Sequence, residues 1–255
     1  MKLHHKISGN GKPLIILHGL FGMLDNWRSI ARKLENQYQC ILVDLRNHGR
    51  SPHDEVMNYN VMANDVLELI EKLQLQSPIV LGHSMGGKTT MQLALDNPDR
   101  LEKIIVVDIA AKKYPPHHES ILNAIRSIEP SKIEERSDAE DIFRQHLGDE
   151  EENIQFLMKN INRLPEGGFE WKANMPVLTT TYANLMENIH STTTFERAAL
   201  FLRGGLSRSL QDEDWPEIVK FFPRAELVTI ANAGHWVHAD QPKALIDALH
   251  TFMKS

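Results

Sequence analysis

The chain has 255 residues, of which 42% are hydrophobic and 24% are charged, as is typical of a globular protein with a sizeable core. Its formal net charge of −6 argues against a nucleic-acid partner, and no stretch approaches a signal peptide's apolar region or the ~20 apolar residues of a membrane span. The single cysteine, Cys40, cannot form an internal disulfide, so we expect a cytoplasmic protein.

Short apolar runs alternate with helical patterns through the first 111 residues. Four runs lack the polar alternation of a half-exposed strand, at residues 13–17, 39–44, 79–81 and 101–108. Apolar residues at helical spacing separate them, for example in 26–34 and 61–73. Continuous apolar strands separated by helices are typical of a mostly parallel sheet covered on both faces. The sequence therefore predicts an α/β fold.

This alternation stops between residues 112 and 191. Helical patterns occupy 118–128, 137–147, 153–164 and 178–189, and 165–171 reads as a turn or small hairpin. Ser137 and Glu140 have capping-box spacing. We therefore predict a sheet core formed by 1–111 and 192–255, with a helical cap, 112–191, inserted after the sixth strand. Five apolar residues are expected to form the cap's own core rather than to contact substrate: Phe143, Phe156, Leu157, Tyr182 and Met186.

The stretch 78–87 reads P-I-V-L-G-H-S-M-G-G and is the motif on which the functional prediction depends. A strand, a G-x-S-x-G turn and a helix in this order are typical of a nucleophile elbow. The turn exposes the Ser84 hydroxyl, which needs a base to become nucleophilic. Gly82 and Gly86 fit because so sharp a turn leaves no room for side chains. We predict that Ser84 is the catalytic nucleophile.

The base should follow the nucleophile in the chain and lie near its end. The pattern of strands resumes at 198–202 and 226–230, and His235 lies on the loop after the last strand. Active sites of parallel sheets gather at such loops. We predict His235 as the general base. His18 and His238 have weaker claims and are expected to be structural.

The third member of the triad is less well determined by the sequence. Asp108 ends the strand that follows the elbow strand, which should place it beside Ser84. Asp212 lies on a later loop and is the alternative, whereas Asp44 precedes the nucleophile and is a poorer choice. We favour Asp108. For the oxyanion hole, we predict the backbone N–H groups of Met85 and Leu20.

These motifs resemble those of the α/β-hydrolase superfamily over the whole chain. His18 to Gly22 resembles its oxyanion loop, 82–86 its elbow, and Gly234-His235-Trp236 its histidine loop. Asp44 to Ser51 resembles its D-x-R-x-x-G-x-S loop. The resemblance implies an α/β-hydrolase fold with an inserted helical cap.

Two features resemble a narrower branch, namely Asn47 and the run 107–110. This is the branch of small bacterial esterases and acyl-thioesterases related to abhydrolase domain-containing protein eleven. In that branch the acid follows the sixth strand, which agrees with Asp108 and accounts for Ser207 where many relatives carry aspartate. Membership implies no cofactor and a cap that sets the preference for the acyl chain.

The predicted function is a serine esterase or thioesterase that acts on small to medium acyl esters or acyl-CoA thioesters. Arg46 and Arg50 could meet an acidic leaving group such as coenzyme A, although a structural or solvated role is favoured. We expect no metal, no membrane partner, and a monomer or small homo-oligomer. Two alternatives stay open: a triad-bearing enzyme that is non-hydrolytic or cleaves carbon–carbon bonds, and a ligand-binding member without turnover.

Overall fold

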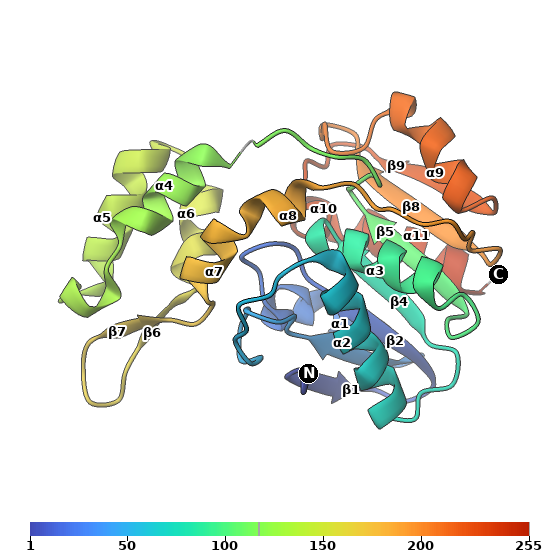
Figure 1. Cartoon of the computed structure of the whole chain (residues 1–255), viewed down its shortest axis with the longest axis horizontal. Coiled ribbons are helices and arrows are strands. Elements are labelled where there is room, and N and C mark those ends of the chain that lie inside the picture. The colour runs from blue at the N-terminus through green and yellow to red at the C-terminus, as the bar shows by residue number, and fades with distance from the viewer. Residues whose placement is uncertain (117, 255) are drawn as a thin grey trace.

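The computed structural model describes residues 1–116 and 118–254, and its centre is a seven-stranded sheet (Figure 1). The strand order is β1-β3-β2-β4-β5-β8-β9. All neighbouring strands are parallel except β1, which pairs antiparallel with β3 at one edge. The bounds are β1 His5–Ser8, β2 Lys12–Leu17, β3 Tyr38–Val43, β4 Ile79–His83, β5 Lys103–Val107, β8 Ala199–Gly204 and β9 Ala225–Ile230. The mostly parallel sheet is as predicted, whereas β1 was not anticipated.

Alternating residues of each strand point to opposite faces of this sheet. Leu14 and Ile16 pack with one layer, and Ile15 and Leu17 with the other. The first layer comprises η1 Leu24–Trp27, α1 Arg28–Leu34 and α11 Pro242–Lys254. The second layer comprises α2 Tyr59–Lys72, α3 Met85–Asp96 and α9 Trp215–Phe221. Both faces are therefore buried, which explains why the strands read as continuous apolar runs.

The cap stands to one side of the sheet, at the left of Figure 1. Its elements are α4 Glu119–Ser127, η2 Pro130–Lys132, α5 Arg136–Leu147, α6 Glu151–Met158, the hairpin β6 Ile161–Arg163 and β7 Phe169–Trp171, α7 Met175–Thr180 and α8 Tyr182–Met186. The hairpin agrees with the turn expected at 165–171. The strand before the insertion is β5, the fifth of this chain rather than the sixth, because only four strands precede it.

Three local expectations within the cap were wrong in detail. The helix predicted over 153–164 ends at Met158 and continues into β6, and the one predicted over 178–189 is two short helices, α7 and α8. Helix α5 begins before Ser137: its N-cap is Glu135, whose N–H donates to Asp138 Oδ2 at 2.8 Å. Spacing alone suggested the wrong cap because several acidic residues compete at this helix end.

The two connections between the domains run side by side. Ile189 N–H donates to Ala111 O, and Tyr114 N–H donates to Met186 O, both at 2.8 Å. The ammonium group of Lys88, from α3, donates to the carbonyl oxygens of Lys112 and Glu187. Both connections are thus tied to the helix that follows Ser84. Among the helices described, none combines the length and apolarity needed to cross a bilayer.

Candidate active site

Ser84 lies at the junction of β4 and α3 in a strained backbone conformation, with φ 52° and ψ −119°. A left-handed φ is uncommon for a residue with a side chain and persists where its surroundings enforce it. A Cβ on Gly82 would lie 2.0 Å from Gly86 O, and one on Gly86 would lie 2.6 Å from His18 O. The turn therefore requires glycine at both positions, as the motif predicted.

The structure brings Asp108 and His235 together. The His235 Nδ1–H donates to Asp108 Oδ2 at 2.7 Å, and the Ser209 hydroxyl lies 3.1 Å from the same nitrogen. Asp108 is fully buried, and its other oxygen accepts from Gly204 N–H at 2.9 Å. The Ser207 hydroxyl donates to Asp108 Oδ2. With Nδ1 as the donor, the other nitrogen of His235, Nε2, carries the lone pair that a general base needs.

The two other aspartates considered lie elsewhere. Asp212 is on the short turn η3, Asp212–Asp214, with its side chain 81% exposed, and it pairs with Arg203 at 2.6 Å. Asp44 is buried and accepts from the N–H groups of Leu24 and Arg50, at 2.7 and 3.0 Å. Neither carboxylate contacts His235 in the described part of the chain.

The predicted oxyanion donors are Leu20 and Met85, and both residues line the same cavity as Ser84. Met85 is the first residue of α3, so its N–H has no acceptor within the helix. Within the described residues, the Leu20 N–H likewise has no hydrogen-bond acceptor. Both groups are therefore available to a developing negative charge.

Two buried histidines hold the loop that carries Leu20. Leu45 N–H donates to His18 Nε2 at 3.0 Å, and Phe21 N–H donates to His48 Nε2 at 3.2 Å. Burial lowers the pKa of His18 to about 4 and that of His48 to about 3. Both rings are therefore neutral at pH 7 and can accept a hydrogen bond. The structural role expected for His18 agrees with this geometry, whereas His48 was not singled out from the sequence.

A second group of rings surrounds the loop of the predicted base. His83 Nε2–H donates to His235 O at 2.8 Å. His238 stacks on Trp27 with ring centroids 4.4 Å apart, and burial lowers its pKa to about 4. The ring of Trp236 contacts Phe156 of the cap, with centroids 4.3 Å apart. His238 is therefore structural, as expected, and the cap reaches the histidine loop.

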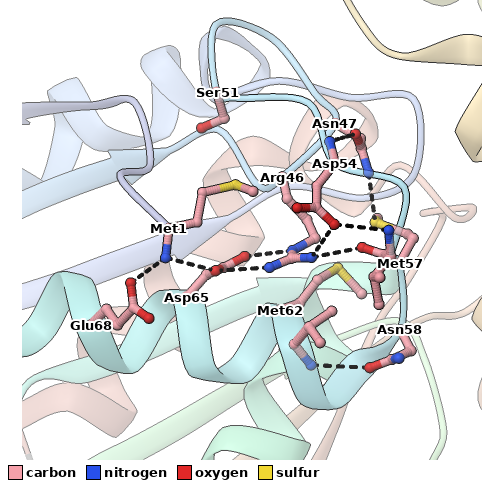
Figure 2. A network of polar contacts seen from close by, with 12 residues as sticks. Met1, Arg46, Asn47, Ser51, Asp54, Met57, Asn58, Met62, Asp65 and Glu68 are labelled. Atoms are coloured by element: carbon pink, nitrogen blue, oxygen red, sulfur yellow. Dashed lines mark hydrogen bonds and ion pairs between the residues drawn. The ribbon is translucent and has the colours of Figure 1, made fainter.

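Arg46 is fixed within the protein (Figure 2). Its guanidinium forms two parallel hydrogen bonds with Asp65 of α2, at 2.6 and 3.0 Å, and donates to Val56 O at 2.6 Å. Asp65 also lies 3.1 Å from the amino group of Met1. A buried, fully engaged arginine is structural, so Arg46 is not placed to meet a leaving group.

A cavity of about 400 Å³ opens above Ser84, lined by residues of both domains. Ser84 and His235 face it together with apolar side chains such as Ile109 and Leu185. Of the five cap residues assigned to the cap's own core, Phe143 and Tyr182 do not line the cavity. The others, Phe156, Leu157 and Met186, do line it, so the core interpretation was incomplete. Within residues 1–116 and 118–254, no group of three or more His, Cys, Asp or Glu side chains is placed to hold a metal ion.

The fold and the site together define a protein of the α/β-hydrolase class. The family described as alpha/beta hydrolase fold matches residues 12–242, and the chain belongs to this family.

Its relatives include named esterases and lipases. Esterase YbfF of Escherichia coli (strain K12) is 40% identical over 247 residues, which cover 96% of this chain and 94% of that protein. The sn-1-specific diacylglycerol lipase ABHD11 of Mus musculus is 36% identical, over 94% of this chain and 80% of the lipase. Among solved structures, a marine microorganism esterase has a TM-score of 0.95 and 43% identity, covering 98% of both chains. The predicted resemblance to the ABHD11-related branch is confirmed, and these relatives support an ester-hydrolysing enzyme.

Proposed function

We propose that this chain is a serine esterase in which Ser84 is the nucleophile, His235 the general base and Asp108 the acid that orients it. The observation that carries the proposal is the 2.7 Å contact between buried Asp108 and His235 Nδ1, on a loop that shares a cavity with the strained Ser84. The esterase and lipase relatives support ester bonds as the target.

The reaction proceeds through an acyl-enzyme. Ser84 Oγ attacks the acyl carbonyl carbon while its proton passes to His235 Nε2, and the N–H groups of Leu20 and Met85 stabilise the resulting oxyanion. The intermediate collapses, the C–O bond to the alcohol breaks, and His235 returns the proton to the leaving alcohol. Water then attacks the acyl-enzyme with the same proton transfers and releases the carboxylic acid.

The Ser207 hydroxyl contacts the carboxylate of the proposed triad. Ser207 donates to Asp108 Oδ2, and this hydrogen bond helps to hold the carboxylate in place. The Ser207 hydroxyl thus supports an acid that follows β5 directly. The imidazolium formed during turnover therefore faces a carboxylate that two further donors hold, the Gly204 N–H and the Ser207 hydroxyl.

The proposed substrates are small to medium acyl esters, with acyl-CoA thioesters as a further possibility that the same triad can cleave. The cavity of about 400 Å³ is lined mostly by apolar groups from both domains, with Lys88 and Arg208 among its polar residues, and the apolar part of the lining suits an acyl chain. Hydrolysis rates over matched series of p-nitrophenyl esters and acyl-CoA thioesters, from two to twelve carbons, would rank chain length and leaving group.

Ser84→Ala tests the proposal most directly. We expect esterase activity on p-nitrophenyl butyrate to fall by at least about 10⁴-fold, because the covalent step is lost. A fluorophosphonate probe should label the wild-type protein at Ser84 and leave the variant unlabelled. Undiminished activity in the variant would refute the proposal, and a folded wild-type protein that neither labels nor hydrolyses esters would favour the ligand-binding alternative.

A further inference from the structure

Asn160 is a buried polar residue in the otherwise apolar interior of the cap. In the described part of the cap, two tyrosines are the other buried residues with a polar group on the side chain. Asn160 lies in the turn between α6 and β6 and is fully inaccessible to solvent. Burying an amide is unfavourable unless hydrogen bonds replace those lost to water. A side chain of this kind in an otherwise apolar interior therefore calls for a specific contact.

The contact that Asn160 makes crosses the boundary between the two domains. Its Nδ2–H donates to the carbonyl oxygen of Phe21 at 2.8 Å. Its own backbone is fixed within the cap, because Asn160 N–H donates to Leu157 O and Lys172 N–H donates to Asn160 O, both at 2.9 Å. The amide therefore projects from a rigid turn onto the loop that carries Leu20.

In the described part of the chain, the oxygen of the same side-chain amide makes no comparable hydrogen bond. Asn160 Oδ1 is buried and has no hydrogen-bond partner among the described residues. An unpaired buried acceptor is destabilising, so an apolar residue of similar size would suit the interior better. What the asparagine provides and an apolar residue cannot is the single bond to Phe21.

Phe21 is itself an unusual residue. Its backbone has φ +59°, a left-handed conformation that a residue with a side chain adopts only when its surroundings impose it. Its N–H is held by His48 Nε2 from the sheet domain, and its carbonyl is held by Asn160 from the cap. The neutral state of His48, favoured by its burial, lets its lone pair accept this bond. The peptide units on the two sides of Phe21, the first of which adjoins Leu20, are thus held from both domains.

We propose that Asn160 is a positioning residue that holds the Leu20 N–H at the oxyanion site by fixing the carbonyl of Phe21. This inference rests on the proposed function and deepens it, because it makes the cap part of the apparatus that stabilises the transition state. Donors aimed at the oxyanion act mainly in the transition state. The bond to Asn160 should therefore affect kcat far more than KM.

The test replaces Asn160 by leucine, which is close in size and lacks the donor. We expect kcat for p-nitrophenyl butyrate to fall about 10- to 100-fold, less than the 10²- to 10³-fold typical of deleting a donor itself, with KM unchanged within about twofold. Asn162→Leu is the matched control. Asn162 lies two residues further along, and its side chain bonds Glu170 at 2.9 Å on the exposed hairpin. We expect this control to keep wild-type kinetics.

Inhibitor binding separates positioning from a loss of folded protein, since a smaller active fraction lowers the apparent kcat but leaves inhibition constants unchanged. Phenylboronic acid forms a tetrahedral adduct with an active-site serine and places an oxygen in the oxyanion site. Its inhibition constant should rise in Asn160→Leu by about the factor that kcat falls, while that of butyrate stays the same. Asn160→Ala, which also removes the donor and introduces no bulk, should behave likewise and serves if the leucine variant does not fold.

An unchanged boronate inhibition constant in the folded variant would overturn the inference. So would equal losses for boronate and butyrate, which would indicate a general distortion of the cavity. The outcome is separable from that of the proposed function. If the wild-type protein labels at Ser84 and the Asn160 variants match it, only the role of Asn160 fails. If Ser84→Ala remains active, the proposed function itself fails.

Discussion

The sheet domain and the cap bury different kinds of side chain. In the sheet domain, polar and charged groups lie deep in the interior, including Asp108 and Lys88 at the candidate site and the Arg46–Asp65 pair away from it. In the described part of the cap, the interior is apolar apart from Asn160 and two tyrosines, and ion pairs such as Arg144–Glu151 are at the surface. Buried polar groups are costly unless they are paired. They are therefore concentrated where loops must be held in one geometry.

The two regions also differ in the strain of their backbones. The strained residues Phe21, Ser84 and Asp108, all with positive φ, surround the candidate site in the sheet domain. The positive-φ residues of the described cap are glycines, for example Gly148 and Gly167, for which this conformation carries no steric cost. At the candidate site, strain and buried hydrogen bonds therefore occur together, and the hydrogen-bond network helps to enforce the conformation.

The largest effect should come from the buried carboxylate of the proposed triad. Asp108→Asn is expected to lower kcat by about 10⁴-fold, because the amide no longer favours the His235 tautomer with a proton on Nδ1. Steady-state kinetics on p-nitrophenyl butyrate would measure this. Asp212→Asn is the control, since Asp212 is 81% exposed and pairs with Arg203, and it should retain activity within about twofold. Loss of activity only in the Asp212 variant would reverse the assignment.

The next prediction compares an ion pair from each region. Arg46→Met should lower the free energy of unfolding by about 3–5 kcal/mol, because it leaves Asp65, only 3% exposed, without its guanidinium partner. Arg144→Met removes an exposed pair of the cap, with side chains 43% and 54% exposed, and should leave the free energy of unfolding nearly unchanged, because solvent screens the pair. Chemical denaturation of both variants would test the comparison. Similar losses in the two would show that burial does not separate the regions.

The smallest expected effect concerns pH. Burial lowers the pKa of His238 to about 4 in the folded protein, whereas an unfolded histidine titrates near 6.5. The unfolded state therefore binds more protons between these values, and the stabilisation is lost as pH falls from about 6.5 toward 4.

His238→Phe keeps a ring against Trp27 and removes this titration. Between pH 7 and pH 5 the wild-type protein should lose about 2 kcal/mol more than the variant in the free energy of unfolding. Denaturant titrations at the two pH values would measure the difference. Parallel losses in both proteins would mean that His238 does not contribute. His18 and His48 should add to the acid sensitivity of the wild-type protein in the same direction.

Much of the sheet domain could be predicted because its signals are local in the chain. Continuous apolar runs identified β2 to β5, and a five-residue motif identified the turn at Ser84. The edge strand β1 was missed because His5–Ser8 is short and mostly half-exposed, so it lacks the apolar run of a central strand. In the cap, the number of helical segments was nearly right, but their ends depended on packing that periodicity does not encode.

Other features could not be read from sequence because they join residues far apart in the chain. Asn160 bonds to Phe21, from which it is separated by 139 positions in the chain. A single asparagine in a segment predicted to be helical gives no indication of such a contact. From the sequence, Ser207 is only a residue that stands where an aspartate was expected. Its hydrogen bond to Asp108 forms because β5 and β8 are neighbouring strands. Which cap residues face substrate was equally undetermined, since Phe156 lines the cavity and Phe143 does not.

By itself the sequence determined the α/β architecture, the sharp turn that exposes Ser84 and the family to which the chain belongs, because backbone geometry and apolar periodicity are imposed by neighbouring residues. Only the tertiary structure decided which aspartate reaches His235, which histidines hold the Leu20 loop and how the cap contacts it. Those choices depend on where β5, β8 and the cap meet in space, and hydrogen-bond distances of about 3 Å between distant segments exist only once the whole chain is packed.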